Sequence, residues 1–290
     1  METNVDKVTR VGMGQKIAFG FGMLANQMFP AALGVFIIVL VQDLGFAALL
    51  WGIIQFAPRI FDAITDPLMG FISDNTKSKW GRRRQYVFIG GILMGIAYVA
   101  MWQLYEDDGI VYNFIYFFSW SLVFYLGLTI FSVPYVAMGY EISDDFHERT
   151  QIMAIAQFIG QWAWVIAPWF WVILYDPSWF PEGAGQGVRD LSVWVAIPCT
   201  IFALVPAIFI KSKSTKERSD FIPININYIL KSIKGIFISA FEAFKIKQFK
   251  KIAFATFLIF NSFQVIAAFT FLIIVHYMFN SEPASAGNWP

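Results

Sequence analysis

Residues 59–70 read Arg59-Ile60-Phe61-Asp62-Ala63-Ile64-Thr65-Asp66-Pro67-Leu68-Met69-Gly70 and lie inside a segment that is otherwise apolar enough to cross a membrane. The segment therefore places three ionisable side chains in hydrocarbon. Each such charge costs about 2.5–3.5 kcal/mol near the centre of a span, and residues of this kind mark functional sites in membrane proteins. The stretch predicts a membrane-spanning helix that carries a polar site.

The composition of the whole chain is that of an integral membrane protein. Of its 290 residues, 58% are hydrophobic and 14% are charged, whereas soluble domains carry about 25% charged residues. The basic residues lie in short loops between apolar segments, so the sequence gives no support for a nucleic-acid partner. The single cysteine, Cys199, permits no intrachain disulfide and no cysteine metal cluster.

The apolar segments predict the fold class. A membrane-spanning helix needs about 20 apolar residues, and these spans must be helical because their backbone groups cannot hydrogen-bond to lipid. We therefore predict an all-α integral membrane protein in which a six-helix bundle is followed by a seventh transmembrane helix. The predicted spans are residues 17–41, 47–73, 86–104, 110–139, 151–175, 189–210 and 252–279.

Lysine and arginine in the short loops predict the orientation, because cytoplasmic loops carry an excess of both. Three regions with this excess fall on the same side if every span crosses once. We therefore expect the N-terminus to be cytoplasmic and the protein to lie in the inner (plasma) membrane. The three regions are the N-terminal segment (Lys7, Arg10, Lys16), the loop after the second span (Lys77, Lys79, Arg82, Arg83, Arg84) and the link at residues 211–251.

This plan divides the chain into three parts: a six-span half at residues 1–210, a basic cytoplasmic link at 211–251, and the first span of a second half at 252–290. Transporters of the major facilitator type are two six-helix halves joined by such a link. The polar ending at residues 281–290 resembles the start of an outside loop, so we expect a truncated twelve-helix transporter. Apolar residues at helical spacing within 224–250 predict either an amphipathic helix on the membrane surface or a helix packed beneath the bundle.

The second span carries a candidate cation site. Asp62 and Asp66 are four residues apart on one helical face, where like charges repel. Either a bound cation shares both carboxylates and the Thr65 hydroxyl, since hard cations prefer oxygen ligands, or one carboxyl holds a proton. The alternative is an ion pair of Arg59 with Asp62 that braces the helix, which leaves Asp66 without a role.

The loop after the second span, residues 70–84, is a basic turn with a glycine at each end. It is either a loop whose charges only set the topology, or it resembles the signature loop of the major facilitator superfamily. That resemblance implies a cytoplasmic latch between helices. The implied gating residues are Gly70, Asp74, Gly81, Arg82, Arg83 and, in the loop after the fourth span, Arg149. The acidic residues beside Arg149 fit either a solvated turn or a latch.

Four motifs together resemble the glycoside–pentoside–hexuronide:cation symporter family, over about residues 15–210. They are Asp62-Ala63-Ile64-Thr65-Asp66-Pro67, Trp80-Gly81-Arg82, Val133-Pro134-Tyr135 and His147-Glu148-Arg149-Thr150. The resemblance implies a site for Na⁺ or H⁺ at Asp62, Thr65, Asp66 and Thr129. It also implies a sugar site at Gln27, Ser132 and Gln157, where a well-studied member of the family has three charged residues and this chain has neutral ones.

Other polar residues in the spans are further candidates for substrate contacts. Gln157, Gln161 and Trp164 share one helical face, and two amides with an indole suit a sugar: hydrogen bonds to hydroxyls and a platform for the ring. The alternative is packing, with Trp164 as a membrane-interface residue. Asn26 and Gln27 are adjacent amides in the first span, suited to the same cavity or to hydrogen bonds between helices.

The sequence thus predicts a symporter of a sugar, glycoside or oligosaccharide, driven by Na⁺ or H⁺. We expect no enzymatic activity and no cofactor, because no nucleophile triad, metal-ligand spacing or phosphate-binding loop is recognisable. The expected partners are a small-molecule substrate and the lipid bilayer. Two alternatives remain: a truncated membrane protein that does not transport, and a symporter of a lysolipid-like amphiphile.

Overall fold

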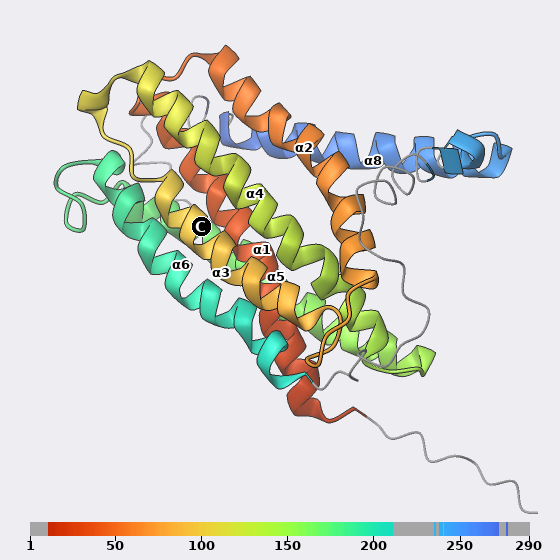
Figure 1. The fold of residues 1–290 in the computed structure, drawn as a ribbon. Coiled ribbons are helices and arrows are strands. Elements are labelled where there is room, and N and C mark those ends of the chain that lie inside the picture. The colour runs from red at the N-terminus through yellow and green to blue at the C-terminus, as the bar shows by residue number, and fades with distance from the viewer. Residues whose placement is uncertain (1–10, 211–234, 236–237, 240, 273–276, 278–290) are drawn as a thin grey trace, which may run out of the picture.

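A computed structural model gives the fold, and it describes residues 11–210, 235, 238–239, 241–272 and 277 (Figure 1). Every regular element within these residues is helical, as the uninterrupted apolar segments predict. The elements are α1 (Met13–Gln42), α2 (Ala48–Asp74), α3 (Arg84–Met101), the short 3₁₀ turn η1 (Glu106–Asp108), α4 (Ile110–Glu141), α5 (Phe146–Leu174), α6 (Ala184–Phe209) and α8 (Lys247–Leu272).

Each predicted span overlaps one of these helices, but their compositions differ. Five of them, α1, α3, α4, α5 and α6, are long and apolar enough to cross a membrane. The α2 helix has 27 residues but is not among the five, because Arg59, Asp62 and Asp66 lower its mean hydropathy. Part of the predicted seventh span and most of the predicted amphipathic helix lie outside the described residues.

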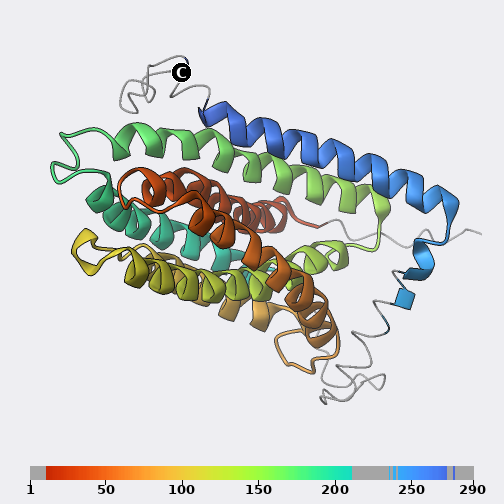
Figure 2. The same cartoon turned by 90° about the horizontal axis from the view of Figure 1, so that it is seen from above.

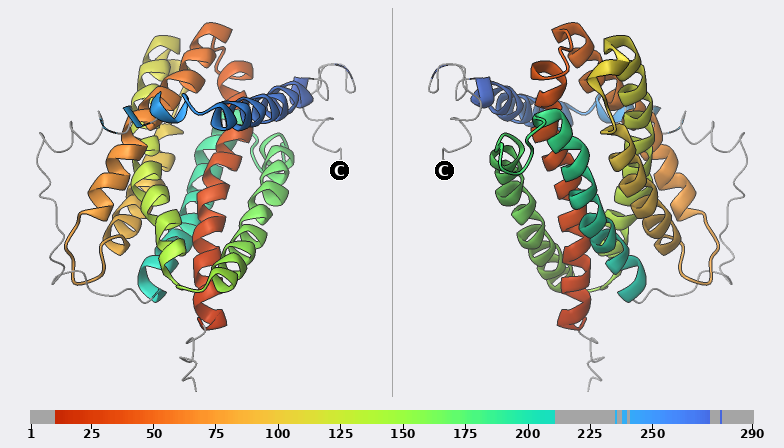
Figure 3. Two further views of the ribbon diagram at one scale, coloured as in Figure 1. Left: turned by 90° about the vertical axis from the view of Figure 1, so that its right-hand side faces the viewer. Right: turned by 90° about the vertical axis from the view of Figure 1, so that its left-hand side faces the viewer.

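The six helices α1–α6 pack as two interlocked triplets (Figure 3). α1 packs against α5 and α6, α4 packs against α2 and α3, and α3 packs against α6. Exchanging α1-α2-α3 with α4-α5-α6 converts the contacts of α1 with α5 and α6 into the contacts of α4 with α2 and α3. The contact of α3 with α6 is converted into itself. Because successive helices alternate in direction, the triplets form an inverted repeat, the arrangement found within each half of a major facilitator transporter.

The centre of the bundle is filled by aromatic side chains. Phe29, Tyr98 and Phe124 form one group, with the Tyr98 ring centroid 5.0 Å from that of Phe29 and 5.7 Å from that of Phe124. Trp102 continues the stack, with its centroid 5.6 Å from Phe36 and 5.1 Å from Phe117. Lipid is as apolar as these rings, so close packing rather than exclusion from water holds such helices together.

The α2 helix is the outer member of its triplet. It packs mainly against α4 and touches α1 over a short stretch, and Figure 1 shows it curving along the side of the bundle. Pro58 and Pro67 lie inside it, and a proline within a helix removes a backbone hydrogen bond and causes a kink. The two prolines flank the segment that holds Arg59, Asp62 and Asp66.

The α8 helix lies outside the six-helix bundle, on the side where α5 lies (Figures 2 and 3). Its large apolar side chains are exposed along the described length, including Phe254, Phe257, Phe260 and Phe263. An apolar surface of this kind fits lipid or another apolar helix.

Candidate functional site: a carboxylate pair and a threonine between two helices

Three of the four residues predicted for the cation site lie together at the contact of α2 with α4. The Thr129 hydroxyl of α4 donates to Oδ1 of Asp66 on α2 at 2.8 Å. The two threonine hydroxyls, of Thr65 and Thr129, are 3.5 Å apart, and that of Thr65 also donates to the backbone carbonyl of Phe61 at 3.0 Å. Thr129 itself is buried, so its hydroxyl reaches α2 from inside the bundle.

Asp62, the fourth residue, lies one helical turn before Asp66 and is ion-paired. Its Oδ2 is 3.8 Å from Nη1 of Arg59, and the Arg59 guanidinium lies 5.8 Å from the ring centroid of Tyr125 on α4. The predicted Arg59–Asp62 ion pair is therefore present beside the Thr65–Asp66–Thr129 contacts. An ion pair that only braces the helix would explain the contact of Asp62, but it would not explain the contacts of Asp66.

These groups present a set of oxygen ligands to the space beside α2. Two carboxylates and two hydroxyls are the donors that hard cations such as Na⁺ take. The two carboxylates lie one turn apart on α2, so they repel each other when both are charged. A proton or a cation shared between them removes this repulsion and stabilises the pair. This set of groups has the chemistry that a site for a cation or a proton needs.

Several residues predicted for the latch meet at one end of the bundle. Arg83, at the start of α3, binds Asp74 at the end of α2, and its Nη1 lies 2.8 Å from Oε2 of Glu141 at the end of α4. Arg82 pairs with the same Glu141 carboxylate. Arg83 is buried, and a guanidinium suits this role because its fork of donors can serve two acids.

The other residues predicted for the latch, Gly70, Gly81 and Arg149, differ from one another in their surroundings. Gly81 has φ +92°, a backbone conformation that costs a residue with a side chain about 1 kcal/mol or more, so the turn before α3 depends on it. Gly70 packs against Val133 of α4, and a Cβ added there would lie 3.8 Å from Val133 Cγ1, an ordinary contact. Arg149 forms no ion pair with the described residues, so the structure does not bring it into the latch.

The acidic loop between α4 and α5 forms ties between helices rather than only a solvated turn. The Glu148 carboxylate accepts hydrogen bonds from the Val11 amide and the Ser143 hydroxyl, each at 2.7 Å, and lies 3.4 Å from Nζ of Lys16 on α1. Asp145 caps α5 by accepting from the Glu148 amide at 2.7 Å. The spacing of Asp145 and Glu148, three residues apart, is a helix-start signal that could have revealed this.

Arg84 is a tie that the sequence did not reveal. Its Nε donates to the Ala207 carbonyl at 2.7 Å, and its Nη2 donates to the Ile208 carbonyl at 3.0 Å. These carbonyls lie in the last turn of α6, where backbone acceptors have no partner within the helix. Together the three consecutive arginines reach α2, α4 and α6: Arg82 and Arg83 bind carboxylates, and Arg84 binds backbone carbonyls.

The predicted substrate residues lie mainly on α1 and α5. The indole Nε1 of Trp164 donates to Oε1 of Gln27 at 3.1 Å, which joins the two helices near their middles. Gln157 and Gln161 are exposed on the same helix as Trp164, and Ser132 is half-buried on α4. Asn26 contacts Sδ of Met23 within α1 at 3.9 Å, so the structure pairs Gln27, and not Asn26, with another helix.

A further tie joins α1 and α5 at the opposite end of the bundle from the latch. The Tyr175 hydroxyl lies 3.1 Å from Oε1 of Gln42 and 3.2 Å from Oδ2 of Asp43. Burial raises the pKa of the Asp43 carboxyl, and the hydrogen bond from Tyr175 opposes that rise. The ends of α1 and α5 are thus tied at both sides of the bundle.

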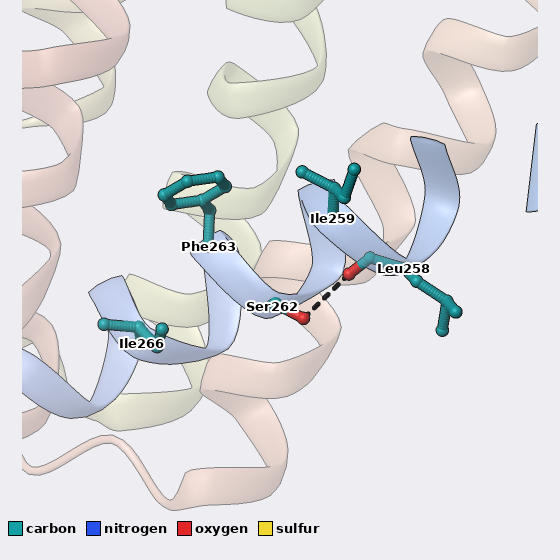
Figure 4. Close-up of a pocket in the computed structure, with 5 residues that line it drawn as sticks. All are labelled: Leu258, Ile259, Ser262, Phe263 and Ile266. Atoms are coloured by element: carbon teal, nitrogen blue, oxygen red, sulfur yellow. Dashed lines mark hydrogen bonds between the residues drawn. The ribbon is translucent and has the colours of Figure 1, made fainter. Parts of the chain in front are cut away.

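A shallow hollow on α8 lies apart from this site (Figure 4). Its lining residues all belong to α8: Leu258, Ile259, Ser262, Phe263 and Ile266. The Ser262 hydroxyl donates to the carbonyl of Leu258 at 2.8 Å, so the one polar side chain of the lining is satisfied within its own helix. The hollow is part of the exposed apolar surface of α8.

An inverted repeat of three helices is the arrangement found within each half of a major facilitator transporter, and here a carboxylate of one triplet contacts a threonine of the other. The chain belongs to the family described as MFS/sugar transport protein, which it matches over residues 18–281. The predicted fold class and the predicted family are thereby confirmed.

Three similar proteins illustrate the family. The chain is 28% identical to a lactose permease of Leuconostoc lactis over 73% of the chain and 36% of the permease. It is 32% identical to the uncharacterized symporter sll1374 of Synechocystis over 47% of the chain and 26% of that protein. It is 30% identical to the sodium-dependent lysophosphatidylcholine symporter 1 of Xenopus tropicalis over 48% of the chain and 27% of that protein. The chain thus covers between 26% and 36% of the length of these relatives.

Proposed function

We propose that this protein is a secondary transporter that moves a sugar, glycoside or oligosaccharide together with a cation, Na⁺ or H⁺. The observation that carries the proposal is the hydrogen bond from Thr129 to Asp66. It joins a carboxylate of α2, the least apolar of the six bundle helices, to a buried hydroxyl of its neighbour α4, in a protein of a sugar-transport family. A charge kept at this cost needs a function, and reversible binding of a cation supplies one.

In the proposed mechanism the cation neutralises the carboxylates of Asp62 and Asp66. Neutralisation lowers the cost of removing both groups from water when the site closes, and Thr65 and Thr129 supply further oxygen ligands. Substrate binds beside this site, near the middle of the membrane, and alternating access follows from rocking of the helices around it. Energy then comes from the cation gradient.

The proposal includes an orientation. The end of the bundle that carries Arg82, Arg83 and Arg84 faces the cytoplasm, because basic loops stay on that side, and the N-terminus lies there too. The protein is then placed in the plasma membrane, with the contacts of Arg83 to Asp74 and Glu141 acting as a cytoplasmic latch. The chain acts on a small molecule and contacts the bilayer.

Uptake measurements test the proposal. Cells that express the full-length protein are given a panel of radiolabelled mono- and oligosaccharides, with an inward Na⁺ gradient, an inward H⁺ gradient or neither. We expect at least one sugar to accumulate with one gradient and not without it, and Asp62→Asn and Asp66→Asn to abolish the accumulation. Undiminished uptake in both variants would overturn the assignment of the cation site.

A lysolipid is the second candidate substrate, and the similarity to a sodium-dependent lysophosphatidylcholine symporter favours it. The same assay separates the two when unlabelled lysophosphatidylcholine competes with the labelled sugar. Uptake of labelled lysophosphatidylcholine together with absence of uptake for every sugar would replace the sugar by the lysolipid and leave cation coupling in place.

A further inference from the structure

The α4 helix is interrupted by a proline close to the candidate cation site. Pro134 lies inside α4 and is buried. A proline has no backbone N–H, so the carbonyl of Ile130, four residues earlier, loses its partner within the helix, and the helix can bend at this turn. Thr129, whose hydroxyl donates to Asp66, directly precedes the turn. The position of this hydroxyl relative to α2 therefore depends on the bend of α4.

Tyr135, the residue after the proline, ties α4 to α1. Its hydroxyl donates to the backbone carbonyl of Phe19, and its ring stacks on the Phe19 ring with the centroids 4.5 Å apart and 18° between the planes. A carbonyl oxygen has two lone pairs, so it can accept this bond and still accept a bond within α1. Among the described residues, Tyr135 is the one residue of α4 that donates a side-chain hydrogen bond to α1.

The surroundings of Tyr135 allow this close contact between the two helices. Tyr135 is fully buried. Gly22 of α1 lies against its ring, and a Cβ added at Gly22 would lie 2.5 Å from Cε2 of Tyr135. Gly139, one turn after Tyr135, lies against the ring of Phe19 in the same way. A side chain at either glycine would push α4 away from α1, so the tie depends on both.

Tyr135 and Thr129 point to different helices from neighbouring turns of α4. They are six residues apart, which corresponds to about 1.7 turns and about 9 Å along the helix axis. The Thr129 hydroxyl contacts α2, and the Tyr135 hydroxyl contacts α1. The α1 helix is itself tied to α5 at several points along its length. Tyr135 thus connects the helix that carries Thr129 to a firmly held pair of helices.

The predicted latch holds the end of α4 as well, but in a different way. Arg83 donates to the carbonyl of Ala137 at 2.7 Å and pairs with Glu141. In the proposed mechanism these contacts at the end of the bundle are exchanged when access alternates between the two sides. The hydrogen bond of Tyr135 is buried inside the bundle, so it can persist while the latch changes.

We infer that Tyr135 is a positioning residue of the cation site. By fixing α4 to α1 directly after the bend at Pro134, it holds the Thr129 hydroxyl where Asp66 can accept its hydrogen bond. The inference rests on the proposed function and adds a residue that acts on the site through Thr129. If the Tyr135 hydroxyl only satisfied itself in the core, it would contribute to stability and not to cation affinity.

The positioning role depends on the bend beside Tyr135. Pro134→Ala restores a backbone N–H, which gives the Ile130 carbonyl its helical partner and makes α4 continuous. A continuous helix holds Thr129 through its own backbone, so the tie by Tyr135 becomes unnecessary. A tyrosine that only contributes to stability has no such dependence, because loss of its hydroxyl has the same effect in either helix.

The test measures cation affinity in Tyr135→Phe, Pro134→Ala and the double variant. Tyr135→Phe keeps the ring and removes only the hydroxyl. The matched control is Tyr98→Phe, which removes the hydroxyl of a buried tyrosine that forms no hydrogen bond within the described residues. Purified full-length protein in lipid nanodiscs is titrated with NaCl at constant ionic strength, and separately with acid at constant NaCl. The cation concentration that gives half of the rise in unfolding temperature measures the affinity.

We expect Tyr135→Phe to raise the half-saturating cation concentration about fivefold, the fold-change that corresponds to the loss of one hydrogen bond. In the Pro134→Ala background the same substitution should raise it less than about twofold, because the two residues are coupled. Tyr98→Phe should leave the concentration unchanged.

An unchanged half-saturating concentration in Tyr135→Phe would overturn the inference. An equal rise in both backgrounds, or an equal rise in Tyr98→Phe, would overturn it as well. Failure of the proposed function has a different signature. The unaltered protein then shows neither a cation-dependent rise in unfolding temperature nor cation-driven uptake, and the inference fails together with the proposed function.

Discussion

The α1–α5 and α2–α4 pairs occupy equivalent places in the inverted repeat but are built differently. The α1–α5 pair is tied at one end by Lys16 and Glu148, in the middle by Gln27 and Trp164, and at the other end by Asp43 and Tyr175. The α2–α4 pair meets at the carboxylate site, and α2 leaves much of its length exposed, including Phe56, Ile60 and Ile64. One pair is braced along its length, and the other is held mainly where its charges lie.

The difference has a physical reason. In the proposed mechanism α2 must be able to exchange the partner of its carboxylates, because a permanently neutralised carboxylate would transport nothing. Extensive packing opposes such exchange, since close-packed interfaces switch between discrete arrangements and do not deform gradually. We therefore expect α1–α5 to act as a rigid frame and α2 to respond to the bound cation.

The largest expected effect is on coupling at α2. Asp66→Asn keeps an oxygen that can accept the Thr129 hydrogen bond but removes the charge, so cation-driven uptake should be lost while folding is retained. Sugar accumulation under each gradient and thermal unfolding of the purified protein measure the two properties. Asp107→Asn, in the exposed turn η1, is the matched control and should accumulate sugar normally.

The next effect is on the frame. Glu148→Leu leaves Lys16 buried without its anionic partner, and removal of one member of a buried ion pair costs about 3–5 kcal/mol. The unfolding temperature should fall strongly, and the double variant Lys16→Met with Glu148→Leu should recover much of the loss. Asp144→Ala, an exposed acid of the same loop, should change the free energy of unfolding by less than about 0.5 kcal/mol. Equal losses in Glu148→Leu and Asp144→Ala would contradict the frame.

A pair of glycines compares the two interfaces directly. Gly160→Ala places a Cβ 2.6 Å from Met23 Cγ in the α1–α5 contact, whereas Gly70→Ala meets only Val133 at 3.8 Å beside α4. Overpacking costs about 1–3 kcal/mol, while alanine gains about 1 kcal/mol over glycine within a helix. Thermal unfolding should therefore show Gly160→Ala destabilised and Gly70→Ala unchanged or stabilised. The opposite order would show that α2–α4 is the tighter interface.

The smallest effect concerns one hydroxyl. Thr129→Val preserves the volume of the side chain but removes the hydrogen bond to Asp66, and a hydrogen bond to a charged group contributes about 1.5–3 kcal/mol. The cation concentration for half-maximal uptake should rise at least about tenfold. Thr129→Ser, which keeps the hydroxyl, should stay close to the original value. A shift of equal size in both variants would point to packing and not to the hydroxyl.

Sequence patterns predicted the helices because each depends on local composition. Uninterrupted apolar runs forced helical spans, and the four-residue spacing of Asp62 and Asp66 placed both carboxylates on one face. The arginines of the turn after α2 indicated a latch, and the family resemblance supplied Thr129. Contacts between residues far apart in the chain could not be predicted, because no local pattern encodes how two helices rotate against each other. Examples are the contacts of Arg84 with the end of α6, of Lys16 with Glu148, and of Trp164 with Gln27. For the same reason no local pattern indicates that Arg149, predicted for the latch, forms no ion pair with the described residues.

The sequence by itself determined that this protein is a membrane-embedded helical bundle with a costly carboxylate pair in its second helix, because hydropathy and helical periodicity are properties of neighbouring residues. The tertiary structure decided that α4 is the helix that contacts this part of α2. It also decided that Asp62 pairs with Arg59 while Asp66 takes the hydroxyl of Thr129. These outcomes depend on how helices distant in sequence rotate and pack against one another, and only the assembled bundle fixes that geometry.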